Sequence, residues 1–179
     1  GEPFLLSIFI LFLLALYIAF YVGVFVLLYA FVRKRLGPML TPFWAASFWV
    51  SLELMRSHFL TGFPWALLGY SQATFLPLIQ IASIGGVYAL SFVIILANSS
   101  LAEFFLEWRR GMRSPGILIP PFLVLLLCLL WGFLSIRKLN QESLAPEDRR
   151  INTTILQGNI DQYMKWDNTY TVSYTHLTL

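Results

Sequence analysis

Residues 4–32 read FLLSIFILFLLALYIAFYVGVFVLLYAFV, an apolar run that contains no charged side chain. A transmembrane helix needs about 20 consecutive, mostly apolar residues, and this run is longer than that. The apolar core of a signal peptide has about 7–15 residues and follows a basic segment, and no basic segment precedes this run. It therefore predicts an internal membrane span, which should end at Arg33–Arg35 and the helix-stopping pair Gly37-Pro38.

The composition of the whole chain also indicates a membrane protein. Of its 179 residues, 58% are hydrophobic and 12% are charged, and the mean hydropathy is +0.73. Soluble domains carry about 25% charged residues, so an ordinary soluble domain and a disordered region are both excluded. The net charge of +3 is small and the cations lie in clusters, which is typical of membrane topology signals rather than of a nucleic-acid surface. A single cysteine excludes an internal disulfide.

Three further apolar segments follow the first, so the sequence predicts an α-helical multi-span membrane protein with about four transmembrane helices. Small residues in the third segment, Gly85 and Gly86 among them, are expected to let helices pack closely. The spans contain almost no ionisable residues, which argues against a transport subunit. The predicted spans cover residues 4–32, 39–56, 75–101 and 117–136.

The distribution of Lys and Arg predicts how the spans are oriented. Arg33–Arg35 and Arg109–Arg113 mark the loops after the first and third spans as cytoplasmic, and the loop with only Arg56 should face outward. Four spans then place both chain ends outside. Arg137 and Lys138 lie just past the last span on that outer side, so the tail must begin a translocated domain, for which the rule weakens.

The polar residues 140–150 predict a linker between the membrane domain, residues 1–139, and a second domain. Residues 151–156 alternate and are rich in β-branched side chains, so they should form a strand that opens this domain, residues 151–171. We expect the chain to be truncated at both ends, and the sequence leaves open that residues 172–179 are foreign.

Two segments carry chemical information, and the first is Leu52–Gln72. Glu53 and Arg56 are three residues apart on one helical face. Arg56 is a charge-assisted donor for a phosphate, or it simply pairs with Glu53. The aromatic loop that follows either contacts lipid or merely anchors the helix end. The aromatic residues of this loop that suit a membrane interface are Phe63, Trp65 and Tyr70.

The second segment is Ile155–Asp167, in which a strand ends at a tight turn. The amides of Gln157 and Asn159 are suited to hold neighbouring loops, and Trp166 could line an apolar groove. Taken alone, this segment is also compatible with a purely structural strand and turn.

Together the two segments resemble the bacterial apolipoprotein N-acyltransferase family over roughly residues 39–167. The motifs match the family in their residue types and also in their order and spacing along the chain. The matching motifs are Glu53-x-x-Arg56, Thr61-Gly62-Phe63-Pro64-Trp65, Gly69-Tyr70-Ser71-Gln72, Gly86-Val87-Tyr88 with Ser91-Phe92, Gln157-Gly158-Asn159-Ile160 and Lys165-Trp166-Asp167.

The resemblance implies a fold and an activity for the full-length parent. Members have eight membrane helices and an external nitrilase-like (CN hydrolase) α/β domain, whose first strand would be the predicted one here. They transfer an acyl chain from a phospholipid to the N-terminal diacylglyceryl-cysteine of a lipoprotein. The reaction passes through a cysteine thioester, with a glutamate as general base and a lysine that stabilises the oxyanion.

The resemblance also implies that this chain carries no catalytic residue, because the family's Glu, Lys and Cys lie beyond residue 179. Cys128 sits among leucines within a span, so we assign it to packing or to a lipid-facing surface. We expect the fragment to be inactive alone. Lipid or substrate contact is expected for Trp166, Arg56, Phe63, Trp65 and Tyr70, and support of active-site loops for Gln157 and Asn159.

The implied partners are a phospholipid acyl donor, a diacylated lipoprotein acceptor and the lipid bilayer. No cofactor, metal or nucleic acid is expected. The implied location is the bacterial inner membrane, with the C-terminal domain on the periplasmic side. Two alternatives are a non-enzymatic membrane scaffold or transport subunit, and a membrane-tethered nitrilase-like amidase.

Overall fold

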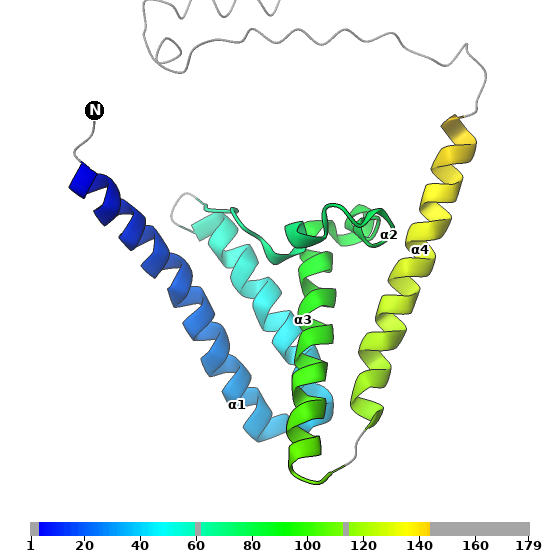
Figure 1. Cartoon of the computed structure of the whole chain (residues 1–179), viewed down its shortest axis with the longest axis horizontal. Coiled ribbons are helices and arrows are strands. Elements are labelled where there is room, and N and C mark those ends of the chain that lie inside the picture. The colour runs from blue at the N-terminus through cyan, green and yellow to red at the C-terminus, as the bar shows by residue number, and fades with distance from the viewer. Residues whose placement is uncertain (1–3, 60–61, 113–114, 144–179) are drawn as a thin grey trace, which may run out of the picture. The chain divides into compact units, whose positions relative to one another are not determined.

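The computed structural model describes residues 4–59, 62–112 and 115–143, and these residues form a helical membrane protein. Three of its helices are long and apolar enough to cross a bilayer. Shorter helical segments connect them (Figure 1). In chain order the elements are α1 (Phe4–His58), η2 (Leu68–Gln72), α2 (Leu76–Ile79), α3 (Ala82–Arg109), η3 (Pro115–Leu118) and α4 (Ile119–Ser143).

The longest helix, α1, reverses direction at Gly37, as Figure 1 shows. Gly37 has φ 72° and ψ 176°, a combination that is essentially restricted to glycine. Pro38 follows at the start of the next helical turn, where its missing N–H costs nothing. The predicted helix stop at Gly37-Pro38 coincides with this reversal. We call residues 4–36 the first arm of α1 and residues 38–58 its second arm.

The two arms and α3 pack through aromatic and small side chains. The rings of Phe25 and Trp49 meet edge-on at 4.9 Å, which joins the first arm to the second. Phe43 meets Phe92 of α3 at 5.8 Å. Small buried residues let the backbones approach closely, as is usual between membrane helices. Those on the second arm and α3 are Thr41, Ala45, Ala46, Ser91, Ser99 and Ser100.

Among the described residues, Gly85 and Gly86 do not make the close helix packing predicted for them. Both residues are exposed, and Gly86 has φ 63° with no atom within 4 Å of the position a Cβ would occupy. The two glycines instead bend the start of α3, where their backbone is non-helical. The close approach occurs elsewhere, at Gly132 of α4, where a Cβ would clash with the Pro77 carbonyl oxygen.

Cys128 of α4 belongs to the small core beneath α2. It is buried together with Leu78, Leu90 and Val93. Of the two positions expected for this cysteine, packing or a lipid-facing surface, the structure shows packing.

The bounds of the last two long helices differ from the predicted ones. The third predicted span began at residue 75, but residues 76–79 form the separate helix α2, and α3 runs on to Arg109. Helix α4 continues to Ser143, so the first residues of the predicted linker, 140–143, are helical. The rest of that linker, the predicted strand 151–156, the domain start 151–171 and residues 172–179 lie outside the described residues.

Candidate functional site

The aromatic loop, residues 62–72, folds back onto the end of α1. The Phe63 N–H donates to the Arg56 carbonyl at 2.9 Å, and the Gly62 N–H donates to the Phe59 carbonyl at 3.1 Å. Gly62 has φ 82°, and a Cβ there would clash with the Ser57 carbonyl oxygen. Glycine is therefore required where the loop leaves the helix.

Glu53 and Arg56 hold the loop from beneath. Both side chains are buried. The Leu68 N–H donates to Glu53 Oε1 at 2.7 Å, and an Arg56 guanidinium N–H donates to the Ala66 carbonyl at 3.4 Å. In the described part of the chain, every ion pair within 4.0 Å involves other residues, so the expected Glu53–Arg56 pair is replaced by two bonds to the loop.

The middle of the loop is fixed on α3. The Gly69 N–H donates to the hydroxyl of Ser91, which is fully buried, at 2.9 Å. A Cβ at Gly69 would clash with Val87, so only glycine lets η2 lie this close to α3. Gly69 and Ser91 are both among the residues that carried the family resemblance, and the structure gives them a shared role in seating the loop.

With its backbone held, the loop presents aromatic rings outward. Phe63 stacks on Trp65 at 6.2 Å and meets Tyr17 of the first arm edge-on at 6.4 Å. Trp65 is 72% exposed and Tyr70 is 55% exposed. Exposed rings with a polar atom are typical of the boundary between hydrocarbon and water. The surface made by Phe63, Trp65 and Tyr70 is here called the aromatic platform.

A cavity of about 150 Å³ lies between the two arms of α1 and the loop. Two buried polar atoms belong to its lining residues: Trp49 Nε1, a donor, and Glu53 Oε2, an acceptor. Neither has a hydrogen-bond partner among the described residues. An unpaired buried polar group costs about 1–3 kcal/mol, so the cavity is suited to a small polar group that both donates and accepts. The lining residues are Ile18, Tyr21, Val22, Trp49, Leu52, Glu53, Arg56 and Ala66.

The structure brings together four of the residues predicted to contact lipid. Arg56, Phe63, Trp65 and Tyr70 all belong to the aromatic loop or to the helix end that holds it. The other predicted residues, Gln157, Asn159 and Trp166, lie outside the described residues.

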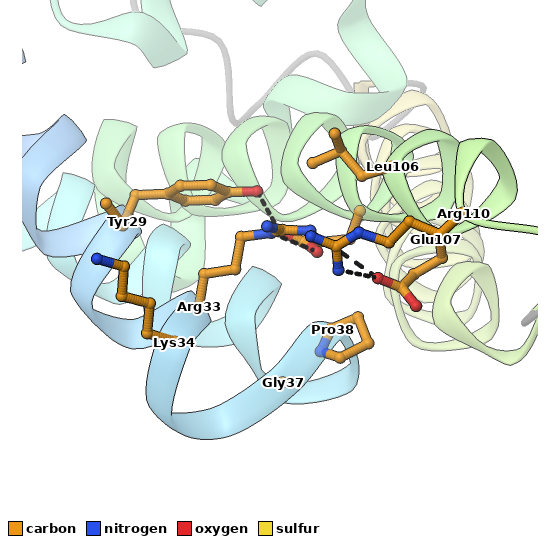
Figure 2. A pocket seen from close by; sticks show the side chains of 10 residues that line it. Tyr29, Arg33, Lys34, Gly37, Pro38, Leu106, Glu107 and Arg110 are labelled. Atoms are coloured by element: carbon orange, nitrogen blue, oxygen red, sulfur yellow. Dashed lines mark hydrogen bonds and ion pairs between the residues drawn. The ribbon is translucent and has the colours of Figure 1, made fainter. Parts of the chain in front are cut away.

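Sequence reasoning missed a second polar cluster, which joins the first arm of α1 to α3. Glu103 is fully buried and accepts hydrogen bonds from the Tyr29 hydroxyl at 2.5 Å and from Arg33 Nε at 2.8 Å. Glu107 is also buried and pairs with Arg110 at 3.1 Å (Figure 2). On each helix, two polar residues lie four positions apart. They are Tyr29 and Arg33 on α1, and Glu103 and Glu107 on α3. This helical spacing was the available signal.

Comparison with known proteins places the chain in a family. The model of the apolipoprotein N-acyltransferase N-terminal domain matches residues 1–100. An apolipoprotein N-acyltransferase of Geobacter metallireducens is 42% identical over 123 residues, which cover 68% of this chain and 23% of that protein. One of Azotobacter vinelandii is 35% identical over 136 residues, or 76% of this chain and 25% of that protein.

A protein of the same name from Haemophilus ducreyi is 30% identical over 141 residues, covering 78% of this chain and 26% of that relative. The chain thus spans about a quarter of the length of the curated relatives it matches. The matched family region includes both arms of α1, the aromatic loop and much of α3. The chain therefore belongs to the apolipoprotein N-acyltransferase family.

Proposed function

We propose that this chain is the lipid-handling membrane part of an enzyme that transfers an acyl chain from a phospholipid to the N-terminal diacylglyceryl-cysteine of a lipoprotein. Its relatives are named for N-acylation of apolipoproteins. The two arms of α1, α3 and α4 would then be four membrane spans. The aromatic loop would lie at the periplasmic face of a bacterial inner membrane, beneath a nitrilase-like catalytic domain.

The arrangement of the aromatic loop carries this proposal. A buried carboxylate and a buried guanidinium are both used to fix backbone atoms of one loop, which then exposes its rings. Holding aromatic rings rigidly at a bilayer surface lowers the entropy lost when they bind a lipid. In the proposed role, the aromatic platform contacts a phospholipid as it rises toward the catalytic domain, and Arg56 lies close enough to attract its phosphate.

The proposal assigns no reacting group to this chain. Cys128 is packed in the core beneath α2, where it could not meet an ester. Catalysis would require a Glu, a Lys and a Cys of the nitrilase-like domain, and Trp166, Gln157 and Asn159 would border that active site. We therefore expect the chain alone to leave a diacylated lipoprotein peptide unchanged in the presence of phospholipid. A third acyl chain on the peptide, detected by mass spectrometry, would refute this assignment.

The lipid-handling role is tested by photocrosslinking. The chain is reconstituted in vesicles that contain a phospholipid with a diazirine near its headgroup, irradiated, digested and analysed by mass spectrometry. Peptides that contain the aromatic platform should carry more label than peptides that contain other exposed aromatic residues. Trp65→Ala should lower labelling of that peptide severalfold.

Trp108→Ala is the matched control, because Trp108 is also exposed but lies in the last turn of α3. It should leave labelling of the platform unchanged. Uniform labelling of all exposed aromatics would instead favour a non-enzymatic scaffold whose rings only anchor helices. A membrane-tethered amidase would be indicated if the complete protein released ammonia from a soluble amide and acylated no peptide.

A further inference from the structure

A second and larger cavity, of about 550 Å³, lies between the first arm of α1 and α3 at the end of the helices that carries the basic residues. It shares no residue with the aromatic platform or with the cavity beneath the aromatic loop. Figure 2 shows the polar side chains of Tyr29, Arg33, Glu107 and Arg110 directed toward one another across it, whereas the Lys34 side chain extends away from them. The ionisable residues that line it are Tyr29, Arg33, Lys34, Glu103, Glu107 and Arg110.

The charges around this cavity do not balance. Glu103 is bonded by Tyr29 and Arg33, and Glu107 lies 3.1 Å from Arg110 and 3.8 Å from Arg33. Both carboxylates are thus neutralised by the two arginines. Three cations face two carboxylates, so one positive charge remains.

That excess charge belongs to Lys34. Its side chain is exposed, and no ion pair or hydrogen bond of Lys34 is found in the described part of the chain. Arg110 is 55% exposed and so retains donors that can face outward. Lys34 and Arg110 line the cavity from different helices, and only Arg110 is neutralised, so the cavity keeps a positive charge that attracts an anion.

The walls of the cavity indicate which kind of anion fits. Ala30, Pro38 and Leu106 line it beside the charged groups, and Phe31 and Met39, each one residue along the chain from a lining residue, are exposed. A free phosphate gains nothing from an apolar wall, whereas the glycerol and acyl parts of a lipid do. Basic pockets between membrane helices are known sites for anionic headgroups.

We propose that this cavity binds the phosphate of an anionic phospholipid, with Lys34 and Arg110 as its ligands and the Arg33–Glu103 pair as the rigid floor. The lipid belongs to the leaflet opposite the aromatic platform. The site would therefore fix the membrane domain in the bilayer without taking part in acyl transfer, and it stands whether or not the proposed function is correct.

The test measures lipid retention by native mass spectrometry of the 179-residue chain in micelles that contain dioleoylphosphatidylcholine and increasing dioleoylphosphatidylglycerol. One phosphatidylglycerol should be retained in preference to phosphatidylcholine. Lys34→Gln should weaken this binding about tenfold, as expected for loss of one charge-assisted hydrogen bond. Lys34→Arg keeps the charge and should stay within about threefold of the unchanged chain.

Arg35→Gln is the matched control. Arg35 is the next residue, carries the same charge and lies 5.3 Å from the centre of the Phe31 ring without lining the cavity. It should weaken phosphatidylglycerol binding by less than about threefold, since only the diffuse attraction is lost. Circular dichroism and elution volume of each variant establish that the helices are intact.

Three outcomes would overturn the proposal. Equal weakening by Lys34→Gln and Arg35→Gln would mean that the attraction is diffuse. Equal retention of phosphatidylglycerol and phosphatidylcholine would mean that the cavity does not select an anionic lipid. Displacement of the retained lipid by an equal free concentration of inorganic phosphate would show a site for free anions instead.

Discussion

The carboxylate of Glu53 is buried, with one oxygen bonded to the Leu68 amide, while its other oxygen has no partner among the described residues. Arg56, one turn further along α1, bonds to the carbonyl of Ala66. Two ionisable side chains are therefore used to satisfy backbone groups of a loop. Burying a charge is costly unless it is hydrogen-bonded, so the bond to the Leu68 amide stabilises both the Glu53 carboxylate and the loop.

Glu53→Ala should destabilise the chain by about 1–3 kcal/mol, because it leaves the Leu68 amide without its acceptor. Glu53→Gln keeps an acceptor oxygen and should cost at most about 1 kcal/mol. The measurement is the free energy of unfolding by detergent titration, followed by circular dichroism. Ser47→Ala, which removes only an exposed bond to the carbonyl of Phe43, is the control and should change little. Equal losses for Glu53→Ala and Glu53→Gln would contradict the role of the Leu68 bond.

At the scale of elements, the apolar runs and the Gly37-Pro38 pair were sufficient to predict the long helices and the reversal within α1. The far end of α3 was not predictable in the same way. Hydropathy treats Glu103 and Glu107 as a reason to leave the membrane, but Arg33 and Arg110 neutralise them in the folded chain. Arg110 is only three residues from Glu107, but Arg33 lies 70 residues before Glu103, and the helical spacing within each element does not say which distant helix it will face.

The candidate site was predictable in part for a related reason. Rings at a loop between spans indicate an interface, so Phe63, Trp65 and Tyr70 were identified from composition and motif. The bonds of Glu53 and Arg56 depend on how the loop folds back, which the three-residue spacing does not show. From spacing alone, an ion pair between them was one of two alternatives, the other being a phosphate contact of Arg56.

Gly37→Ala should destabilise the helix hairpin by about 1–3 kcal/mol, since the backbone there is one that only glycine adopts without strain. No atom lies within 4 Å of the position of the added Cβ, so the loss would come from the backbone and not from a clash. Gly23→Ala, in regular helix with equally open space, is the matched control and should cause no loss. Unfolding by detergent titration compares the two. A loss in both variants would mean that the added methyl, rather than the reversal, is responsible.

Glu103→Leu should also loosen the contact between α1 and α3, because the partly buried Arg33 loses its nearest carboxylate and keeps only that of Glu107, 3.8 Å away. Breaking a buried pair in this way costs about 3–5 kcal/mol, and the 24% exposure of the Arg33 side chain places the expected loss at about 3 kcal/mol or below. Combining it with Arg33→Met removes the unpaired charge and should recover at least half of the loss. The same detergent titration measures it. If the double variant is no more stable than Glu103→Leu, the charge is not the cause.

At the scale of the whole described domain, two basic clusters and the aromatic platform lie at opposite ends of the long helices. Arg33–Arg35 and Arg109 lie at one end, and the aromatic platform lies near the other end of α3, beside its residues 87–91. Such an arrangement favours one orientation in a bilayer, with the basic end cytoplasmic.

Cysteine labelling should reveal this orientation. In a Cys128→Ala background, Trp65→Cys should react with a membrane-impermeant maleimide added outside intact spheroplasts, and Arg109→Cys should react only after lysis. Both positions are exposed, so access to the side chain does not limit the reaction. The reverse pattern would place the platform in the cytoplasm and exclude a periplasmic acyl transfer at this surface.

The bond between Arg33 and Glu103 also bears on biogenesis. The guanidinium leaves the ribosome 70 residues before the carboxylate that neutralises it. A partly buried arginine is costly without its carboxylate, so the first arm of α1 can pack at this end only after α3 has been synthesised. The order in which the chain is synthesised, and not only the final packing, therefore determines when α1 and α3 can pack together.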